Sequence, residues 1–166
     1  MSDIRTLLRY KAWANELIFA DVSKLPEPAL VEPQPIIFGN LLRTLNHVHA
    51  MDYVWQSHLQ GSPHGLTSRN PDYCGTFCDV RNAQRAMDEW YIDYADRLAP
   101  AALDETITFT FIGGTEPASM SRGDILMHVV NHGTYHRGHI AGMMHKHGVM
   151  APTTDLPVFL KTYRRG

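Results

Sequence analysis

One segment near the end of the chain constrains the fold more than any other, because it joins a helical period to a cluster of histidines. Six of the ten histidines lie within residues 128–147. His128, His132 and His136 recur every four residues, so a helix would place their side chains on one face, with His139 close to the same stripe. The sequence therefore predicts a long helix with one histidine-bearing face.

The rest of the chain predicts three further long helices and one hairpin. Apolar residues recur with a period near 3.6 over residues 4–25, 37–59 and 80–99, which is typical of helices with one buried face. Four prolines within residues 26–35 are expected to prevent any regular element there. Alternating polar and apolar residues around a Gly-Gly pair predict a hairpin over residues 106–120. The predicted fold class is all-α: a four-helix bundle with a small β-hairpin before the last helix, and antiparallel neighbours are its simplest arrangement.

Two polar residues are the expected starts of helices. Asp79 could cap the third long helix. Ser121 precedes Asp124 by three residues, which resembles a capping box with Asp in place of Glu or Gln, and it would open the histidine-bearing helix. Gly148 is a typical residue for the end of that helix.

Composition limits the classes of protein and of partner. The 166 residues fit one domain, residues 1–166, and the hydrophobic and charged fractions of 44% and 19% are globular. A net charge of −2 gives no positive field, so no nucleic-acid partner is expected. No apolar run approaches the roughly 20 residues that span a bilayer, and no secretory signal is evident, which predicts a cytoplasmic protein with no membrane partner. Cys74 and Cys78 are expected to be free thiols, and residues 161–165 a solvated tail.

Histidines four residues apart on a helix can present two nitrogens to one metal ion from the same side. A single helix cannot complete such a site, so a third ligand must come from a facing helix. The helix over residues 37–59 offers His47 and His49 on opposite flanks of its apolar stripe, and periodicity does not choose between them. Ordinary packing or solvation of the histidines is the simpler alternative.

Two other kinds of active site lack the residues they need. A ferritin-like di-iron site requires Glu-x-x-His pairs, and no E-x-x-H occurs in the chain. A serine hydrolase of the nucleophile-elbow type requires G-x-S-x-G, which is also absent.

Several segments together resemble a known family. The sequence resembles the DinB/YfiT-like family of metal-dependent enzymes over nearly its whole length. The resemblance lies in the segments YKAWANELIF (10–19), NHVHAMDYVWQSHLQG (46–61), ILMHVVNHGTYHRGHI (125–140) and HGVMAPTTDLPVFL (147–160). Its most specific part is NHGTYHRG, within the third of these segments.

The resemblance implies a four-helix bundle, often a homodimer, that binds one divalent metal. By motif position it implies that His47, His132 and His136 are the metal ligands, which selects His47 over His49. Sites of three histidines accept Zn, Ni, Fe, Co or Mn, so the ion is expected to be a divalent transition metal without being named.

Four further residues are candidates for supporting roles around these ligands. Asp52 lies on an apolar stripe and needs a partner, either a ligand histidine that it orients or a salt bridge to Arg137. His128 lies one turn before the H-x3-H pair and could support it or contact substrate. His139 stands where the family commonly has Gln, and a supporting or surface position is favoured over a ligand role.

Three imidazoles leave a coordination position open, which is typical of catalytic sites. The family includes low-molecular-weight thiol transferases and a thiol-dependent isomerase, so the resemblance implies thiol (S-) transfer ahead of hydrolysis, on a small-molecule substrate with a low-molecular-weight thiol as partner. The alternative is a non-catalytic metal- or small-ligand-binding protein with a stress-response role.

Overall fold

The computed structural model describes residues 3–71 and 75–163. Most of this part is helical, with one two-stranded antiparallel hairpin, and the predicted fold class is confirmed. The elements in chain order are α1 (Ile4–Val22), α2 (Glu27–Val31), α3 (Leu41–Gln60), α4 (Phe77–Arg97), the 3-10 helix η1 (Pro100–Asp104), β1 (Thr106–Thr110), β2 (Pro117–Ser121), α5 (Arg122–Lys146) and α6 (Leu156–Tyr163).

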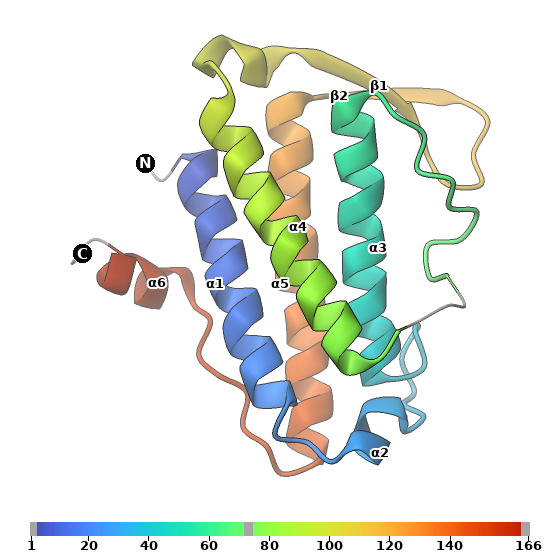
Figure 1. The fold of residues 1–166 in the computed structure, drawn as a ribbon, viewed down its shortest axis with the longest axis vertical. Helices are drawn as coiled ribbons and strands as arrows, with labels where there is room; N and C mark the ends of the chain where they lie inside the picture. Colours follow the sequence, from blue (N-terminus) through green and yellow to red (C-terminus); the bar gives the residue numbers. More distant parts are fainter. Residues whose placement is uncertain (1–2, 72–74, 164–166) are drawn as a thin grey trace.

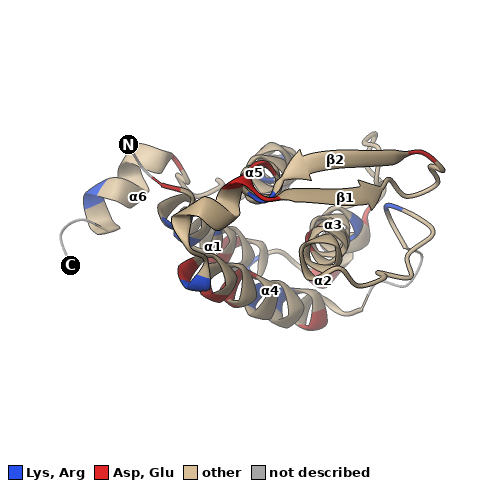
Figure 2. Cartoon of the chain, turned by 90° about the horizontal axis from the view of Figure 1, so that it is seen from above, with Lys and Arg blue, Asp and Glu red and all other residues tan. Residues whose placement is uncertain are grey.

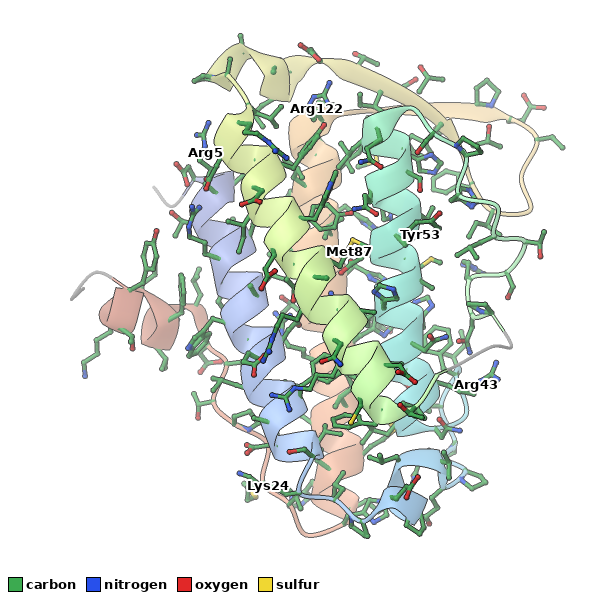
Figure 3. All side chains as sticks on the ribbon, viewed as in Figure 1. Arg5, Lys24, Arg43, Tyr53, Met87 and Arg122 are labelled. Carbon is green, nitrogen blue, oxygen red and sulfur yellow. The ribbon has the colours of Figure 1, made fainter. Side chains whose placement is uncertain are left out.

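The four long helices form the bundle, and each packs against two others. Their order around the bundle is α1, α4, α3 and α5, and the hairpin crosses one end over α3 and α5 (Figure 2). Met87 points into the apolar interior from α4, whereas Arg5 at the start of α1 donates hydrogen bonds to the carbonyl oxygens of Ala95 and Leu98 (Figure 3). No helix among the described residues is long and apolar enough to cross a membrane.

The directions of the helices differ from the expected antiparallel neighbours. α3 and α4 run the same way, as do α1 and α5, whereas the α1–α4 and α3–α5 pairs are antiparallel (Figure 1). The cause is the long connection after α3, which returns the chain to the opposite end of the bundle before α4 begins. Because α3 and α5 are antiparallel neighbours, the first half of α3 lies beside the second half of α5.

Side-chain caps set the starts of the helices that carry the site. Asn40 caps α3 by accepting a hydrogen bond from the amide of Arg43 at 2.8 Å, so this helix begins four residues later than the expected residue 37. Ser121 caps α5 as predicted, accepting from the amide of Asp124 at 3.0 Å. The prediction that Asp79 caps α4 is wrong. Thr76 is the cap of α4, and Asp79 completes its capping box.

Two short helices lie where none was expected. In α2 a proline occupies the first turn, where the missing amide hydrogen costs no hydrogen bond, and Leu30 is buried. α6 follows Pro152, where no helix was expected, and Phe159 packs on α1 with its ring 5.8 Å from that of Tyr10 and 5.5 Å from that of Trp13. The end of α6 includes residues 161–163 of the expected solvated tail, and these residues are exposed. Both helices depend on contacts with residues distant in sequence.

Candidate metal centre

Three histidines from two antiparallel helices meet inside the bundle. α3 contributes His47, and α5 contributes His132 and His136 one turn apart. The Nε2 atoms of His47 and His132 lie 3.2 Å apart, and those of His132 and His136 lie 3.1 Å apart. His47 and His136 are 5% and 4% exposed. The structure thus brings the three predicted ligands together, with one nitrogen of each ring facing the others.

The electrostatic state of these rings is neutral. Burial and, to a smaller extent, the neighbouring histidines lower the pKa of His132 and of His136 to about 3. Burial also lowers the pKa of His47, against the opposing effect of its hydrogen bond to the Arg69 backbone. At neutral pH the cluster therefore holds unprotonated imidazoles, the form that binds metals.

The hydrogen bond to the Arg69 carbonyl also fixes the tautomer of His47. Its Nδ1 lies 2.6 Å from that oxygen, which can only accept, so the proton is on Nδ1 and the lone pair on Nε2. The Phe38 ring stacks on the His47 ring, with 3.9 Å between the ring centroids. His47 is consequently held in the orientation of a metal ligand.

The spacing of the donors fits a transition metal. Zinc–nitrogen bonds of about 2.0–2.1 Å in a tetrahedral site separate neighbouring nitrogens by about 3.3 Å. Two of the Nε2–Nε2 separations, 3.2 Å for His47–His132 and 3.1 Å for His132–His136, are close to this value, and all three ligand atoms lie within 4.8 Å of one another. A cation between the three nitrogens would accept a lone pair from each neutral ring. The residues present are therefore compatible with a bound metal ion.

The other predicted histidines lie around this trio at different distances. His128 stacks beside His132 with ring centroids 5.7 Å apart, and its other neighbour is the Trp55 ring at 4.9 Å. His139 lies further along α5, with its ring 5.5 Å from that of His136. His49 points away from the trio and lines a separate cavity of about 370 Å³ between α3 and α4.

Asp52 has neither of its two expected partners, a ligand histidine or Arg137. Its carboxylate accepts hydrogen bonds from Lys11 Nζ at 2.7 Å and from Gln84 Nε2 at 2.8 Å, and it bonds to no ligand histidine and not to Arg137. The sequence could not predict these partners, because Lys11 and Gln84 lie on other helices and only the fold shows which sides of those helices face Asp52. Asp52 therefore belongs to a buried charged network.

That network joins four helices behind the histidines. Lys11 also pairs with Asp88, whose second oxygen accepts from Asn15 at 2.8 Å. Arg137 donates to the Asn15 side-chain oxygen at 3.0 Å and to Thr134 at 2.8 Å, and its guanidinium lies over the Tyr10 ring. A methyl group at Gly133 would lie 3.2 Å from Arg137 Nη1 and 3.5 Å from Lys11 Cε, so glycine leaves room for both cations.

A cavity of about 290 Å³ opens beside the trio, and sequence patterns did not predict it. Its polar lining residues are His58 and the exposed Arg69, and its apolar lining residues are Met51, Val54, Trp55, Phe111 and Ile112. It adjoins the site at two points: the Arg69 carbonyl bonds to His47, and Trp55 contacts His128. The period of α3 places Met51 and Trp55 on the His47 face. Arg69 comes from the connection after α3, which carries no period, and Phe111 follows the end of β1.

The fold and this site together define a class: a helical bundle with a three-histidine group suited to a metal ion. The family model described as DinB family matches residues 1–165, and the chain belongs to that family. The predicted resemblance is therefore confirmed.

Similar proteins agree with this assignment. The chain is 25% identical over 165 residues to Protein DinB of Bacillus subtilis (strain 168), covering 96% of this chain and 95% of that protein. The crystal structure of a DinB-like protein from Bacillus cereus ATCC 10987 has the same fold, with a TM-score of 0.66 and 17% identity over 89% of this chain and 94% of the other.

Proposed function

We propose that this protein is a metal-dependent enzyme that activates a nucleophile for transfer to, or hydrolysis of, a small molecule. Its metal ligands are His47, His132 and His136. The observation that carries the proposal is the convergence of three neutral imidazoles, two buried and one half-buried, near a cavity large enough for part of a substrate. A structural metal site would need no such cavity.

A divalent transition metal held by these rings supplies Lewis-acid chemistry, since it lowers the pKa of a coordinated water or thiol towards neutrality. The residues of the chain do the rest. The Arg69 carbonyl keeps the proton of His47 on Nδ1, and burial keeps all three rings unprotonated. Trp55 and Met51 line the approach with apolar surface, which positions an organic substrate.

Thiol transfer is the favoured reaction and hydrolysis the second, in keeping with the family resemblance. Both reactions use the same open coordination position, so the donor set favours neither. Zn, Ni, Fe, Co and Mn all accept three imidazoles, and availability decides among them.

Metal content is the first measurement. Tag-free protein, purified and reconstituted, should hold about one ion per chain by mass spectrometry. The single variants His47→Ala, His132→Ala and His136→Ala should each lose it, whereas His139→Ala should keep it. A wild-type protein that holds no metal after reconstitution, with the variants equally stable, would return the histidines to ordinary packing.

Activity is measured next on the metal-loaded protein. Conjugation of glutathione-like thiols to a panel of electrophiles, and hydrolysis of small esters and amides, should be faster than with His132→Ala. A protein that binds metal yet accelerates none of these reactions would be a non-catalytic metal-binding protein. Light scattering tests the homodimer that the resemblance implies.

A further inference from the structure

The cavity of about 290 Å³ beside the histidines has the chemistry of a substrate subsite. Its lining residues carry one permanent positive charge, on Arg69, and include no acidic side chain among the described residues. Burial lowers the pKa of His58, so this second polar group is neutral at pH 7. An anion is therefore the charged group that the cavity favours.

Arg69 is available for such an anion. Within residues 3–71 and 75–163 its guanidinium makes no hydrogen bond and no ion pair, although the backbone of the same residue is fixed by the bond from His47. Other arginines of the bundle are paired, as Arg81 and Arg85 are with Glu16. A guanidinium with five donors binds a carboxylate through two parallel hydrogen bonds.

The remaining walls indicate the body of the ligand. Trp55 and Phe111 present aromatic rings, and Met51, Val54 and Ile112 add aliphatic surface. Flat rings favour an aromatic or planar apolar partner, stacked or edge-on. The volume lies at the lower end of the range of ligand pockets, about 300–1,000 Å³, so the ligand is small.

We propose that this cavity binds the electrophilic substrate, and that the substrate is a small aromatic or planar apolar compound with a carboxylate held by Arg69. The inference rests on the proposed function, because the cavity contacts the site through the Arg69 carbonyl and through Trp55 and His128. It assigns Arg69 a role in substrate specificity, separate from the three ligands. The organic body lies along the His47 face of α3.

The test compares two probes of the same shape, 3-phenylpropionate and its neutral amide, by calorimetry on the zinc-loaded full chain. The acid should bind about tenfold more tightly than the amide, as expected for a hydrogen-bonded charge pair. Arg69→Gln should abolish that preference and leave the zinc content unchanged, because its backbone carbonyl remains. Arg97→Gln is the matched control, since Arg97 is an exposed arginine that does not line the cavity, and it should keep the preference.

A second variant tests the apolar walls. Phe111 is 60% exposed, so Phe111→Ala should fold normally, yet it should weaken the acid and the amide alike by about threefold. An acid preference that survives in Arg69→Gln, or equal binding of both probes by the wild type, would overturn the proposal. No detectable binding of either probe would also overturn it.

The His132→Ala variant separates this inference from the proposed function. An acid preference retained in that variant, without metal, supports the subsite even if the metal proves dispensable. If the preference is lost in His132→Ala and retained in Arg69→Gln, the carboxylate binds the metal ion. That result refutes the subsite and leaves the proposed metal site intact.

Discussion

Two buried polar clusters lie a few residues apart in this bundle, and they differ in how their charges are balanced. In the charged network, Lys11, Asp52, Asp88 and Arg137 balance two positive charges with two negative ones. Side-chain hydrogen bonds link these groups, although Asp52 Oδ1 and Arg137 Nε have no partner among the described residues. In the histidine cluster, three neutral nitrogens face one another instead, and the Nδ1 atoms of His132 and His136 have no partner among the described residues.

The difference teaches where to look for a ligand. Buried charges that pair with opposite charges serve the fold, because each offsets the desolvation cost of its partner. Neutral donor atoms that converge with no opposite charge among them are suited to a cation from outside the chain. On this physical ground Asp52, although it lies on the same helix as His47, belongs to the fold and not to the site.

Lys11→Met should break the charged network and give the largest effect. Burial lowers the pKa of Lys11, but Asp52 and Asp88 outweigh it and raise that pKa, so the side chain is charged. Its removal leaves two buried carboxylates without their cation and should cost about 3–5 kcal/mol in the free energy of unfolding. Urea denaturation measures this, with the exposed Lys24→Met as control. A loss below about 1 kcal/mol would mean that the network is dispensable.

His132→Ala should show the opposite behaviour, because the proposed metal site would stabilise the fold through the bound ion. With free zinc at about a hundred times its dissociation constant, the wild type should gain about 2.7 kcal/mol. The variant should gain almost nothing and should match the wild type within about 1 kcal/mol in a chelator. Thermal unfolding with and without zinc measures both, with His139→Ala as a control that keeps the gain. A full gain in His132→Ala would exclude it as a ligand.

Acid should destabilise the metal-free protein through the same two rings. The pKa values of His132 and His136 are about 3 in the folded state and about 6.5 in the unfolded chain. The unfolded state therefore binds more protons between these values, and stability falls as the pH drops from about 6.5 towards 3. At pH 5, unfolding of the double variant His132→Gln, His136→Gln should take up about two fewer protons than unfolding of the wild type. Denaturation between pH 7 and pH 4 gives the slope of the free energy of unfolding against pH for each protein. Equal slopes for the wild type and the double variant would contradict neutral rings in the folded state.

Local patterns in the sequence were enough to predict the long helices and the hairpin. They also predicted that His132 and His136 lie together, since this depends on spacing along one helix. The motif added His47, and the structure brings its Nε2 close to theirs. The partners of Asp52 and the helix α6 could not be predicted, because both depend on which sides of distant elements meet. The parallel pairing of α3 with α4 likewise follows from the course of a long connection.

The cavity and the covering of His47 depend on connections, which have no period to reveal them. Arg69 orients His47 through a backbone oxygen, a contact that any residue type could make. Phe38 likewise lies among the prolines and glycine before α3, where no pattern marks it as a neighbour of the site. The sequence could therefore locate the three histidines of the candidate site but not the groups that hold and surround them.

Phe38→Leu should have the smallest effect, and it tests whether shape as well as hydrogen bonding holds the histidine cluster. The Phe38 ring stacks on His47 with an interplanar angle of 21°. Loss of an aromatic pair costs about 0.5–1.5 kcal/mol, so zinc should bind about two- to tenfold more weakly in competition with a chelating dye. Phe77→Leu removes a ring that packs on Phe19 instead and should leave zinc affinity unchanged. Equal losses in both variants would show a general effect on packing, and the Arg69 carbonyl would then be the sole support of His47.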